Sequence, residues 1–402
     1  MRFITCVVAW SVPSFAMAQA TFQALGDLPG GPYETYVSGV SADGKVVVGS
    51  SIGVNGGEAV YWTKPTGLVA LGDLPGGIFL STSVAANATG SVIVGVGRSA
   101  NGQEAFRWES GVMTPLGDLA GGPFSSTATG VSADGTIVVG VSETGSGSRA
   151  FRWTFSDGMI VIPPVSGDAV GLGAGVSASG EVVVGLSGPP SQNKQGFWWS
   201  EDTGSVGIGE NPSAATAVSA DGRYIVGYLY DDAYRWSSDG GIETLGSPWA
   251  RAYAVSADGR TIVGGDLTCH PANCAGFSFA FLWTPEKGVQ DLKTLLTTTY
   301  GLNLKGWTLK EATGVSADGR TIVGNGTFEY TPGFLRAEGW VVRLPGPCKP
   351  DCEEDGDLDA FDFLCFQARF AAGDLWADFE LDGDLDVFDF LAFQASVAAG
   401  CQ

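Results

Sequence analysis

Residues 40–44 read VSADG, and the same five letters return at 131–135, 218–222, 255–259 and 315–319. An apolar run such as KVVVG (45–49) or TIVVG (136–140) follows the copies. An Asp-Gly pair between apolar runs is a strong hairpin signal, because glycine tolerates the positive φ of a tight turn. The pattern predicts scaffold turns, not binding groups, for the recurring aspartates: Asp43, Asp134, Asp221, Asp258 and Asp318.

These turns belong to longer repeats. Seven segments begin at Leu25, Leu71, Leu116, Ile162, Ile208, Leu245 and Leu292, at intervals between 37 (208 to 245) and 47 (245 to 292) residues. The first reads as four strands, at 35–40, 45–49, 58–62 and 68–71. Its second strand is apolar at successive positions, so both faces must be buried. Seven such repeats predict an all-β fold, a seven-bladed β-propeller over residues 19–345.

The two ends of the repeat region complement each other. The last repeat ends at GWVVRLP (339–345), which matches a third strand, and a fourth is missing. TFQALG (21–26) aligns with the fourth strands GLVALG (67–72) and VMTPLG (112–117). We therefore expect the N-terminal strand to complete the last blade and close the propeller, which leaves no unpaired repeat face.

Other recurring residues also indicate scaffold. The tryptophans of the AFRW-like motifs are expected at one register, as packing between blades: Trp62, Trp108, Trp153, Trp236, Trp283 and Trp340. The LGDLPGG-type segments place Asp27, Asp73 and Asp118 on loops between blades. Because the same residue recurs with the repeat, we interpret it as structural.

The repeat signature resembles the family of extracellular repeats called HAF, which carries VSADG, VVVG and AFRW in these forms. The resemblance covers residues 21–345. It implies an exported repeat protein and brings no established activity with it.

The first 18 residues indicate export. Arg2 precedes an apolar stretch that ends with small residues at Ala16 and Ala18, as in a secretory signal peptide cleaved after Ala18. A membrane anchor is the alternative, but the apolar run is shorter than the roughly 18 residues of a spanning helix and contains Pro13. We expect a secreted, extracellular protein without a membrane span.

Acidic residues are concentrated at the C-terminus. The net charge is −22, and residues 346–402 hold 14 acidic residues against Lys349 and Arg369, a balance of −12. Such a surface repels phosphate groups, which argues against nucleic acid and anionic membranes as partners, and favours divalent cations.

Two twelve-residue windows, DCEEDGDLDAFD and DFELDGDLDVFD, place acids at positions 1, 3, 5, 7, 9 and 12 with glycine at 6. This is the spacing of a calcium loop. The spacing predicts two Ca²⁺ ions with these ligands: Asp351, Glu353, Asp355, Asp357 (backbone carbonyl), Asp359 and Asp362; and Asp378, Glu380, Asp382, Asp384 (backbone carbonyl), Asp386 and Asp389. A solvated acidic tail would not explain the duplicated spacing. Each loop runs into an apolar helix, so calcium should drive folding here.

Aspartate at position 12 and the paired loop-helix format resemble a dockerin module of the subgroup ending in Gly-Cys, here Gly400 and Cys401. The resemblance covers 348–402 within a domain of residues 346–402. It implies docking to a cohesin-like or other surface protein, and thus display at a cell surface. Positions 10 and 11 depart from the cellulosomal pattern, since they are Ala360-Phe361 and Val387-Phe388. This departure indicates an apolar docking surface.

Six cysteines remain after removal of the signal peptide, and an even number in an exported chain suggests disulfides. Cys269 and Cys274 could close a small loop. The other four allow three pairings, of which we favour Cys348 with Cys401 and Cys352 with Cys365.

The sequence favours a binding or structural role over catalysis. It has one histidine, His270, and no nucleophile-elbow, zinc-protease or phosphate-loop motif. The repeats differ most at 266–279, 291–310 and 325–336, loops that should share one propeller face in the last two blades. They predict a glycan or protein ligand surface with Trp307, Tyr330, Phe328 and His270; a cap over the closure seam is the alternative. The competing function is a carbohydrate-binding or carbohydrate-active propeller, either a lectin or a glycoside hydrolase or lyase.

Overall fold

A computed structural model describes residues 20–190, 194–230, 232–247, 249–266, 279–345, 352, 360–377, 379 and 385–399. The chain divides into two compact units, Thr21–Arg343 and a second one that holds Leu344–Gln402. We call them the repeat domain and the C-terminal domain and describe each by itself.

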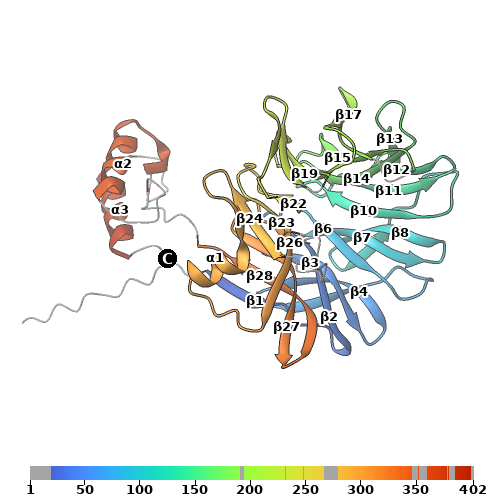
Figure 1. Cartoon of the computed structure of the whole chain (residues 1–402), viewed down its shortest axis with the longest axis horizontal. Helices are drawn as coiled ribbons and strands as arrows, with labels where there is room; N and C mark the ends of the chain where they lie inside the picture. Colours follow the sequence, from blue (N-terminus) through green and yellow to red (C-terminus); the bar gives the residue numbers. More distant parts are fainter. Residues whose placement is uncertain are drawn as a thin grey trace, which may run out of the picture. The chain divides into compact units, whose positions relative to one another are not determined.

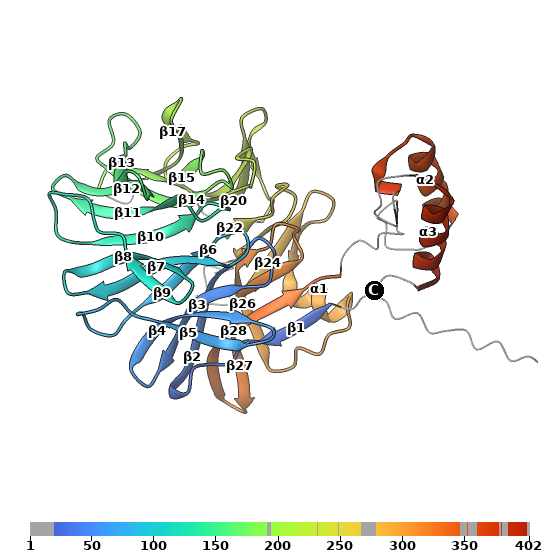
Figure 2. The same cartoon turned by 180° about the vertical axis from the view of Figure 1, so that it is seen from behind.

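The repeat domain is built almost entirely of antiparallel strands, and its sheets are arranged around a shared centre (Figure 1, and from behind in Figure 2). Five sheets have four strands each, in chain order. The second unit is β6 (Thr82–Ala86), β7 (Val92–Ser99), β8 (Gly102–Glu109) and β9 (Val112–Pro115), and the third is β10 (Ser126–Val131), β11 (Val138–Thr144), β12 (Gly147–Thr154) and β13 (Gly158–Ile162). The fourth is β14 (Val170–Val176), β15 (Val183–Gly188), β16 (Gln195–Ser200) and β17 (Gly204–Ile208). The fifth is β18 (Ser213–Val218), β19 (Tyr224–Leu229), β20 (Asp232–Ser237) and β21 (Gly241–Thr244), and the sixth is β22 (Ala250–Val255), β23 (Ile262–Asp266), β24 (Phe279–Thr284) and β25 (Gly288–Asp291).

The remaining strands form an eight-stranded sheet from both ends of the repeat domain. The first unit contributes β2 (Gly30–Val40), β3 (Val47–Gly53), β4 (Gly56–Thr63) and β5 (Gly67–Gly72). The last unit contributes β26 (Trp307–Val315), β27 (Thr321–Thr331) and β28 (Phe334–Arg343), with β1 (Thr21–Ala24) antiparallel to β28. The sequence predicted this addition of the N-terminal strand. The two units meet at one parallel pair, Glu34 with Ala337.

The VSADG segments are scaffold turns, as predicted. In the first, Gly44 has a φ of +70°, and the Ser41 hydroxyl donates to Asp43 Oδ1 at 2.6 Å. The Lys45 N–H donates to the same carboxylate oxygen at 3.0 Å, and the Val46 N–H donates to Ser41 Oγ. The connection between β2 and β3 spans six residues, so it is longer than the four residues, 41–44, that separate the strands expected from the sequence. The other four copies repeat these bonds.

Backbone hydrogen bonds join neighbouring turns. The donor and acceptor pairs are Asp43 to Ala88, Ala88 to Ala133, Ala133 to Ala178, Ala178 to Ala220, Ala257 to Ala317 and Ala317 to Ala42. All these turns therefore lie on one face of the repeat domain, which we call the turn face.

Burial follows the predicted pattern with one exception. In β3, Val47 and Val48 are 2% and 1% exposed, so this strand is covered on both faces. Trp62 pairs with Val47, and the equivalent tryptophans hold the same register: Trp108, Trp153, Trp199, Trp236 and Trp283. Trp340 does not, since it pairs with Gly324, where the other units have a valine, phenylalanine or tyrosine. The sequence prediction was wrong in including Trp340, and it omitted Trp199.

Two segments that the sequence suggested as loops are partly regular. Residues 325–336 form the end of a β-hairpin, because β27 continues to Thr331 and β28 begins at Phe334. Within 291–310, α1 (Leu292–Thr298) is a short helix whose Leu292, Leu295 and Leu296 are buried. Asp291 caps it by accepting from the Thr294 N–H.

The C-terminal domain is helical, with α2 (Ala360–Ala371), η1 (Leu375–Ala377) and α3 (Val387–Ala399). The rings of Phe366 and Phe393 stack at 4.3 Å between their centroids and join the two helices. A disulfide links Cys352 to Cys365, one of the predicted pairs. The other predicted pairs, Cys348 with Cys401 and Cys269 with Cys274, lie outside the described residues.

Candidate functional site

The face opposite the turn face carries the connections that vary most. Because the strands of a unit alternate in direction, hairpins between second and third strands lie at the end away from the VSADG turns. The connections from one unit to the next lie at that end too. We call this side the hairpin face.

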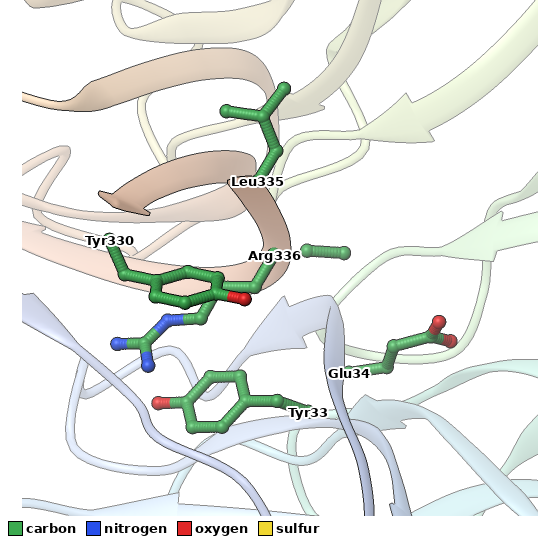
Figure 3. Close-up of a pocket in the computed structure, with 6 residues that line it drawn as sticks. Tyr33, Glu34, Tyr330, Leu335 and Arg336 are labelled. Carbon is green, nitrogen blue, oxygen red and sulfur yellow. The ribbon is translucent and has the colours of Figure 1, made fainter. Parts of the chain in front are cut away.

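A pocket of about 300 Å³ lies on the hairpin face where the first and last units meet. Figure 3 shows the pocket between β2 and the β27–β28 hairpin. Its lining residues are Tyr33, Glu34, Tyr330, Leu335, Arg336 and Ala337.

Arg336 is the central side chain of this pocket. Its guanidinium lies 3.9 Å from the ring centroid of Tyr33 and 5.8 Å from that of Tyr330, between the two rings (Figure 3). A third ring, Phe328, lies 5.2 Å away. Arginine stacked on aromatic faces is attracted to their negative quadrupole and stiffened by the contact.

A buried carboxylate completes the cluster. Glu338 is 1% exposed; it accepts a hydrogen bond from the Tyr33 hydroxyl at 2.8 Å and one from Arg336 Nε at 3.1 Å. Burial, and then the bond to Glu338, raises the pKa of Tyr33 to about 12. Burial also raises the pKa of the nearby Asp27 carboxyl, against the opposing charge of Arg336. Charge on Glu338 is thus compensated inside the fold.

The same strand position in other units explains why this glutamate exists. In the first and second units, Glu58 and Glu104 accept from the backbone N–H groups of Gly72 and Gly117, and so anchor the loops that lead to the next unit. In the last unit Glu338 instead binds Tyr33 and Arg336. The glutamate at this repeated position therefore has different hydrogen-bond partners where the two ends of the repeat domain meet.

The structure brings together some of the residues that were predicted to form a ligand surface. Tyr330 is 56% exposed and lines the pocket, and Phe328 packs beneath Arg336. Trp307 is only 8% exposed because it packs between Phe22 and Phe328, with ring centroids 4.9 and 5.3 Å away, so it supports the surface from below. His270 lies outside the described residues.

Sequence reasoning missed Tyr33 and Glu338, and it included Arg336 only as the end of the variable segment 325–336 without assigning it a role. Tyr33 follows a loop motif shared with other units, and Glu338 stands at a scaffold position. The departure of AEGW (337–340) from the AFRW pattern was the available signal.

Exposed large hydrophobic side chains gather on the hairpin face. They occupy hairpins and connections of several units: Val54, Ile78, Phe79, Leu80, Tyr230, Trp249, Tyr330, Phe334 and Leu335. Tyr230 and Trp249 also have positive φ values of 55° and 70°, which bulky residues rarely adopt. Strained backbone and exposed apolar surface together are typical of an interaction site.

The C-terminal domain shows one part of each predicted calcium segment. Asp362 and Asp389, at position 12 of the two segments, are 2% and 1% exposed. Asp362 Oδ1 accepts from the Cys352 N–H and Asp389 Oδ1 accepts from the Phe379 N–H, both at 2.7 Å. Cys352 and Phe379 both stand at position 2. In both segments, therefore, the backbone N–H at position 2 donates to the aspartate carboxylate at position 12, which lies in the helix.

Most predicted calcium ligands lie outside the described residues: Asp351, Glu353, Asp355, Asp357, Asp359, Asp378, Glu380, Asp382 and Asp384. Asp386 is described, and its N–H donates to Asp389 Oδ2 at 2.8 Å. In the described part of the chain, no three metal-binding side chains come together.

No family model and no curated protein matches the sequence. Among solved structures, the chain is similar to oligogalacturonate lyase from Vibrio parahaemolyticus at 12% identity, over 81% of this chain and 97% of that one, with a TM-score of 0.52. The chain is also similar to virginiamycin B lyase from Staphylococcus aureus at 12% identity, over 81% of this chain and 99% of that one, with a TM-score of 0.49. TolB from Acinetobacter baumannii is 10% identical over 62% of this chain and 60% of TolB, with a TM-score of 0.41. The chain thus spans about 60% of the length of TolB.

The likeness to the oligogalacturonate lyase, with the four-stranded sheets, shows a β-propeller-like fold. At this identity it shows nothing of activity. None of the helices in the described ranges has the length and apolar character to cross a bilayer.

Proposed function

We propose that the chain is an exported, non-catalytic binding protein. Its repeat domain would be a closed, seven-bladed β-propeller of HAF type that binds a macromolecule through the hairpin face. Its C-terminal domain would be a dockerin-like module that binds two Ca²⁺ ions and anchors the protein to a cohesin-like surface partner.

Closure with seven blades is supported by contacts between the ends of the repeat domain. β1 pairs with β28, and the Ala317 N–H donates to the Ala42 carbonyl at 2.9 Å. A central cavity of about 250 Å³ is lined by residues from β2, β6, β10, β14, β18, β22 and β26. These are the first strands of all seven units, so a ring accounts for the contacts better than an open array.

The single observation that carries the docking proposal is the surface of the C-terminal helices. Phe361 and Leu364 on α2 are 59% and 56% exposed, and Val387 and Leu391 on α3 are 61% and 51% exposed. Leu364 and Leu391 stand at the same position of the two segments, two residues after the position-12 aspartate. Each of the two segments thus has exposed apolar side chains at the start of its helix, next to the predicted calcium ligands. Exposed apolar side chains are what a protein-docking surface requires.

The calcium proposal rests on donor chemistry. Asp362 and Asp389 are almost fully buried, and a buried carboxylate is stable only when charge or hydrogen bonds compensate it. The remaining predicted donors are oxygens, which Ca²⁺ prefers. Calcium would supply the positive charge that lets these carboxylates share one loop.

Two features support a non-catalytic repeat domain. The central cavity is lined only by aliphatic residues, glycine, serine and threonine. In the hairpin-face pocket, Glu338 already accepts from Tyr33 and Arg336.

A carbohydrate ligand is the second candidate, and the hairpin-face pocket favours it. Sugars stack on aromatic rings and accept or donate hydrogen bonds at their hydroxyls. The pocket offers the rings of Tyr33 and Tyr330, the Arg336 guanidinium and the Glu34 carboxylate.

Two assays separate these candidates. In the first, immobilised cohesin modules are offered the mature chain with Ca²⁺ and then with a chelator; capture that needs Ca²⁺ supports docking, and equal capture in both argues against it. In the second, a glycan array and polysaccharide turnover are measured with the same protein. Binding without turnover supports a lectin, whereas turnover contradicts the non-catalytic proposal.

A further inference from the structure

A second cavity opens on the turn face, where the last unit meets the first. It has a volume of about 510 Å³. Its walls come from β1, from the end of β28 and from the turn between β4 and β5, and they are mostly apolar. The lining residues are Thr21, Phe22, Gln23, Gly44, Lys45, Trp62, Thr63, Lys64, Pro65, Thr321, Val341 and Arg343.

Strand register explains why this junction is open. In the first unit Tyr61 pairs with Val48, and its ring lies 5.8 Å from Trp108 of the next unit. Trp198 covers Trp236 in the same way, with ring centroids 6.3 Å apart.

In the last unit this register position holds Val341, opposite Val323. A valine is too short to cover Trp62 as a tyrosine covers Trp108. The equivalent cavity beside Tyr61 and Trp108 measures only about 260 Å³.

Three cations line the open cavity: Lys45, Lys64 and Arg343. No carboxylate is among its lining residues, although two of the cations have an acidic neighbour: Lys45 Nζ lies 3.6 Å from the carboxylate of Asp43, and the charge of Arg343 acts on Asp318. The chain has only 21 lysines and arginines against 43 acidic residues, so three cations around one cavity make a local positive potential.

The matching cavity shows that these cations are not a feature of the repeat. There, Ser91 follows Gly90 as Lys45 follows Gly44. Ser110 likewise stands two residues after Trp108, at the place that Lys64 takes after Trp62. The junction of the last and first units thus differs from its counterpart both in space and in charge.

We propose that this cavity binds an organic anion with a flat apolar body, such as an aromatic carboxylate or sulfonate. The apolar body packs among Phe22, Trp62 and Val341, where it is removed from water. The acidic group is held by Lys45, Lys64 and Arg343. This site lies on the turn face and does not depend on the ligand of the hairpin face.

The probe for the test is 8-anilinonaphthalene-1-sulfonate, whose fluorescence rises in apolar surroundings, with neutral N-phenyl-1-naphthylamine as its matched analogue. We expect saturable binding of one sulfonate per mature chain, weakened by salt, and weaker binding of the neutral analogue. Absence of saturable binding, or equal binding of both probes without salt dependence, overturns the proposal.

Variants locate the site. K45S/K64S installs the residues of the matching cavity, and we expect it to raise the dissociation constant about tenfold. V341Y, which restores the covering ring of the first unit, should abolish binding. K287S changes a lysine in the equivalent turn between β24 and β25, away from the cavity, and should have no effect. Circular dichroism checks folding, and unchanged binding in folded K45S/K64S places the probe elsewhere and refutes the proposal.

Discussion

The backbone N–H of Ala317 donates to the carbonyl oxygen of Ala42 at 2.9 Å, across 275 residues of sequence (317 − 42). It is the same bond that joins neighbouring VSADG turns elsewhere. The last VSADG turn is therefore bonded to the first in the way that neighbouring turns are bonded elsewhere, which supports the proposed closure of the repeat domain. The stability of this junction should depend on contacts between the two ends of the repeat domain.

The first prediction concerns Phe22 of β1. Its ring lies 4.9 Å from Trp307 and 6.5 Å from Trp340, so F22A removes packing that ties the N-terminal strand to the last unit. We expect a loss of about 2 kcal/mol in unfolding free energy, below the full cost for a buried phenylalanine because Phe22 is half-buried. Denaturant unfolding measures it. Q23A, at the exposed neighbouring position, is the control and should cost little.

The second prediction concerns the turn aspartates in acid. Hydrogen bonds from the Ser132 hydroxyl and from the Thr136 N–H lower the pKa of Asp134. A lowered folded-state pKa stabilises the fold above the ordinary aspartate pKa, and this stability is lost as pH falls through the folded-state value. The fourth unit has Ser179 in place of the aspartate, so D134S copies a natural turn. Because Asp134 is exposed, we expect D134S to cost only about 0.5–1 kcal/mol at pH 7.

That cost should shrink as pH falls below the ordinary aspartate value and through the lowered folded-state pKa of Asp134, because the wild-type carboxyl then loses its charge. Thermal unfolding of both proteins across pH 2–7 measures the difference. A constant difference at every pH would show that the charge of Asp134 contributes nothing.

The third prediction concerns Tyr33. Since its pKa is raised to about 12, its neutral form contributes stability below the ordinary tyrosine value near 10, and the contribution is lost as pH rises toward 12. The difference in absorbance at 295 nm between wild type and Y33F should titrate near pH 12. A midpoint near 10 would contradict the buried bond to Glu338.

The fourth prediction concerns calcium. A ligand that binds only the native state at 100 times its dissociation constant adds about 2.7 kcal/mol, so Ca²⁺ should raise the melting temperature of the C-terminal domain and a chelator should lower it. D389A removes a proposed ligand and should halve or abolish this rise. D374A changes an exposed aspartate paired with Arg369 between the two segments, and it should leave the rise intact. An equal rise in D389A would argue against the second site.

The fifth prediction separates docking from calcium binding. F361E/V387E places charge on exposed apolar positions of α2 and α3, and should abolish calcium-dependent capture by cohesin modules through desolvation of the new carboxylates. The melting shift caused by Ca²⁺ should persist. Q367E, at another exposed position of α2, is the control for added charge. Undiminished capture by F361E/V387E would exclude this surface.

Local sequence patterns predicted the strands well, because a turn and the two apolar runs beside it are determined by residues that are close together in the sequence. Asp43 and Gly44 specify a turn from their own chemistry, and Val47 and Val48 report burial on both faces. The N-terminal strand was also predictable, since TFQALG (21–26) repeats a pattern found in other units.

Contacts that occur once in the molecule could not be predicted in this way. Tyr33 and Glu338 are 305 residues apart, and although Glu338 stands at a repeated position, its bond to Tyr33 joins the two ends of the repeat domain, so only the folded chain brings them together. Trp340 was placed in the wrong register because one motif letter matched while its neighbours did not. The pairing of Cys352 with Cys365 was one of three combinatorial options, which spacing does not decide.

The pairing of β1 with β28 determines when this part of the repeat domain can fold. β1 is synthesised some 300 residues before its partner β28, so its backbone groups stay without that partner until β28 has been made. We therefore expect this seam to be the last part of the repeat domain to fold and the first to exchange its amide protons.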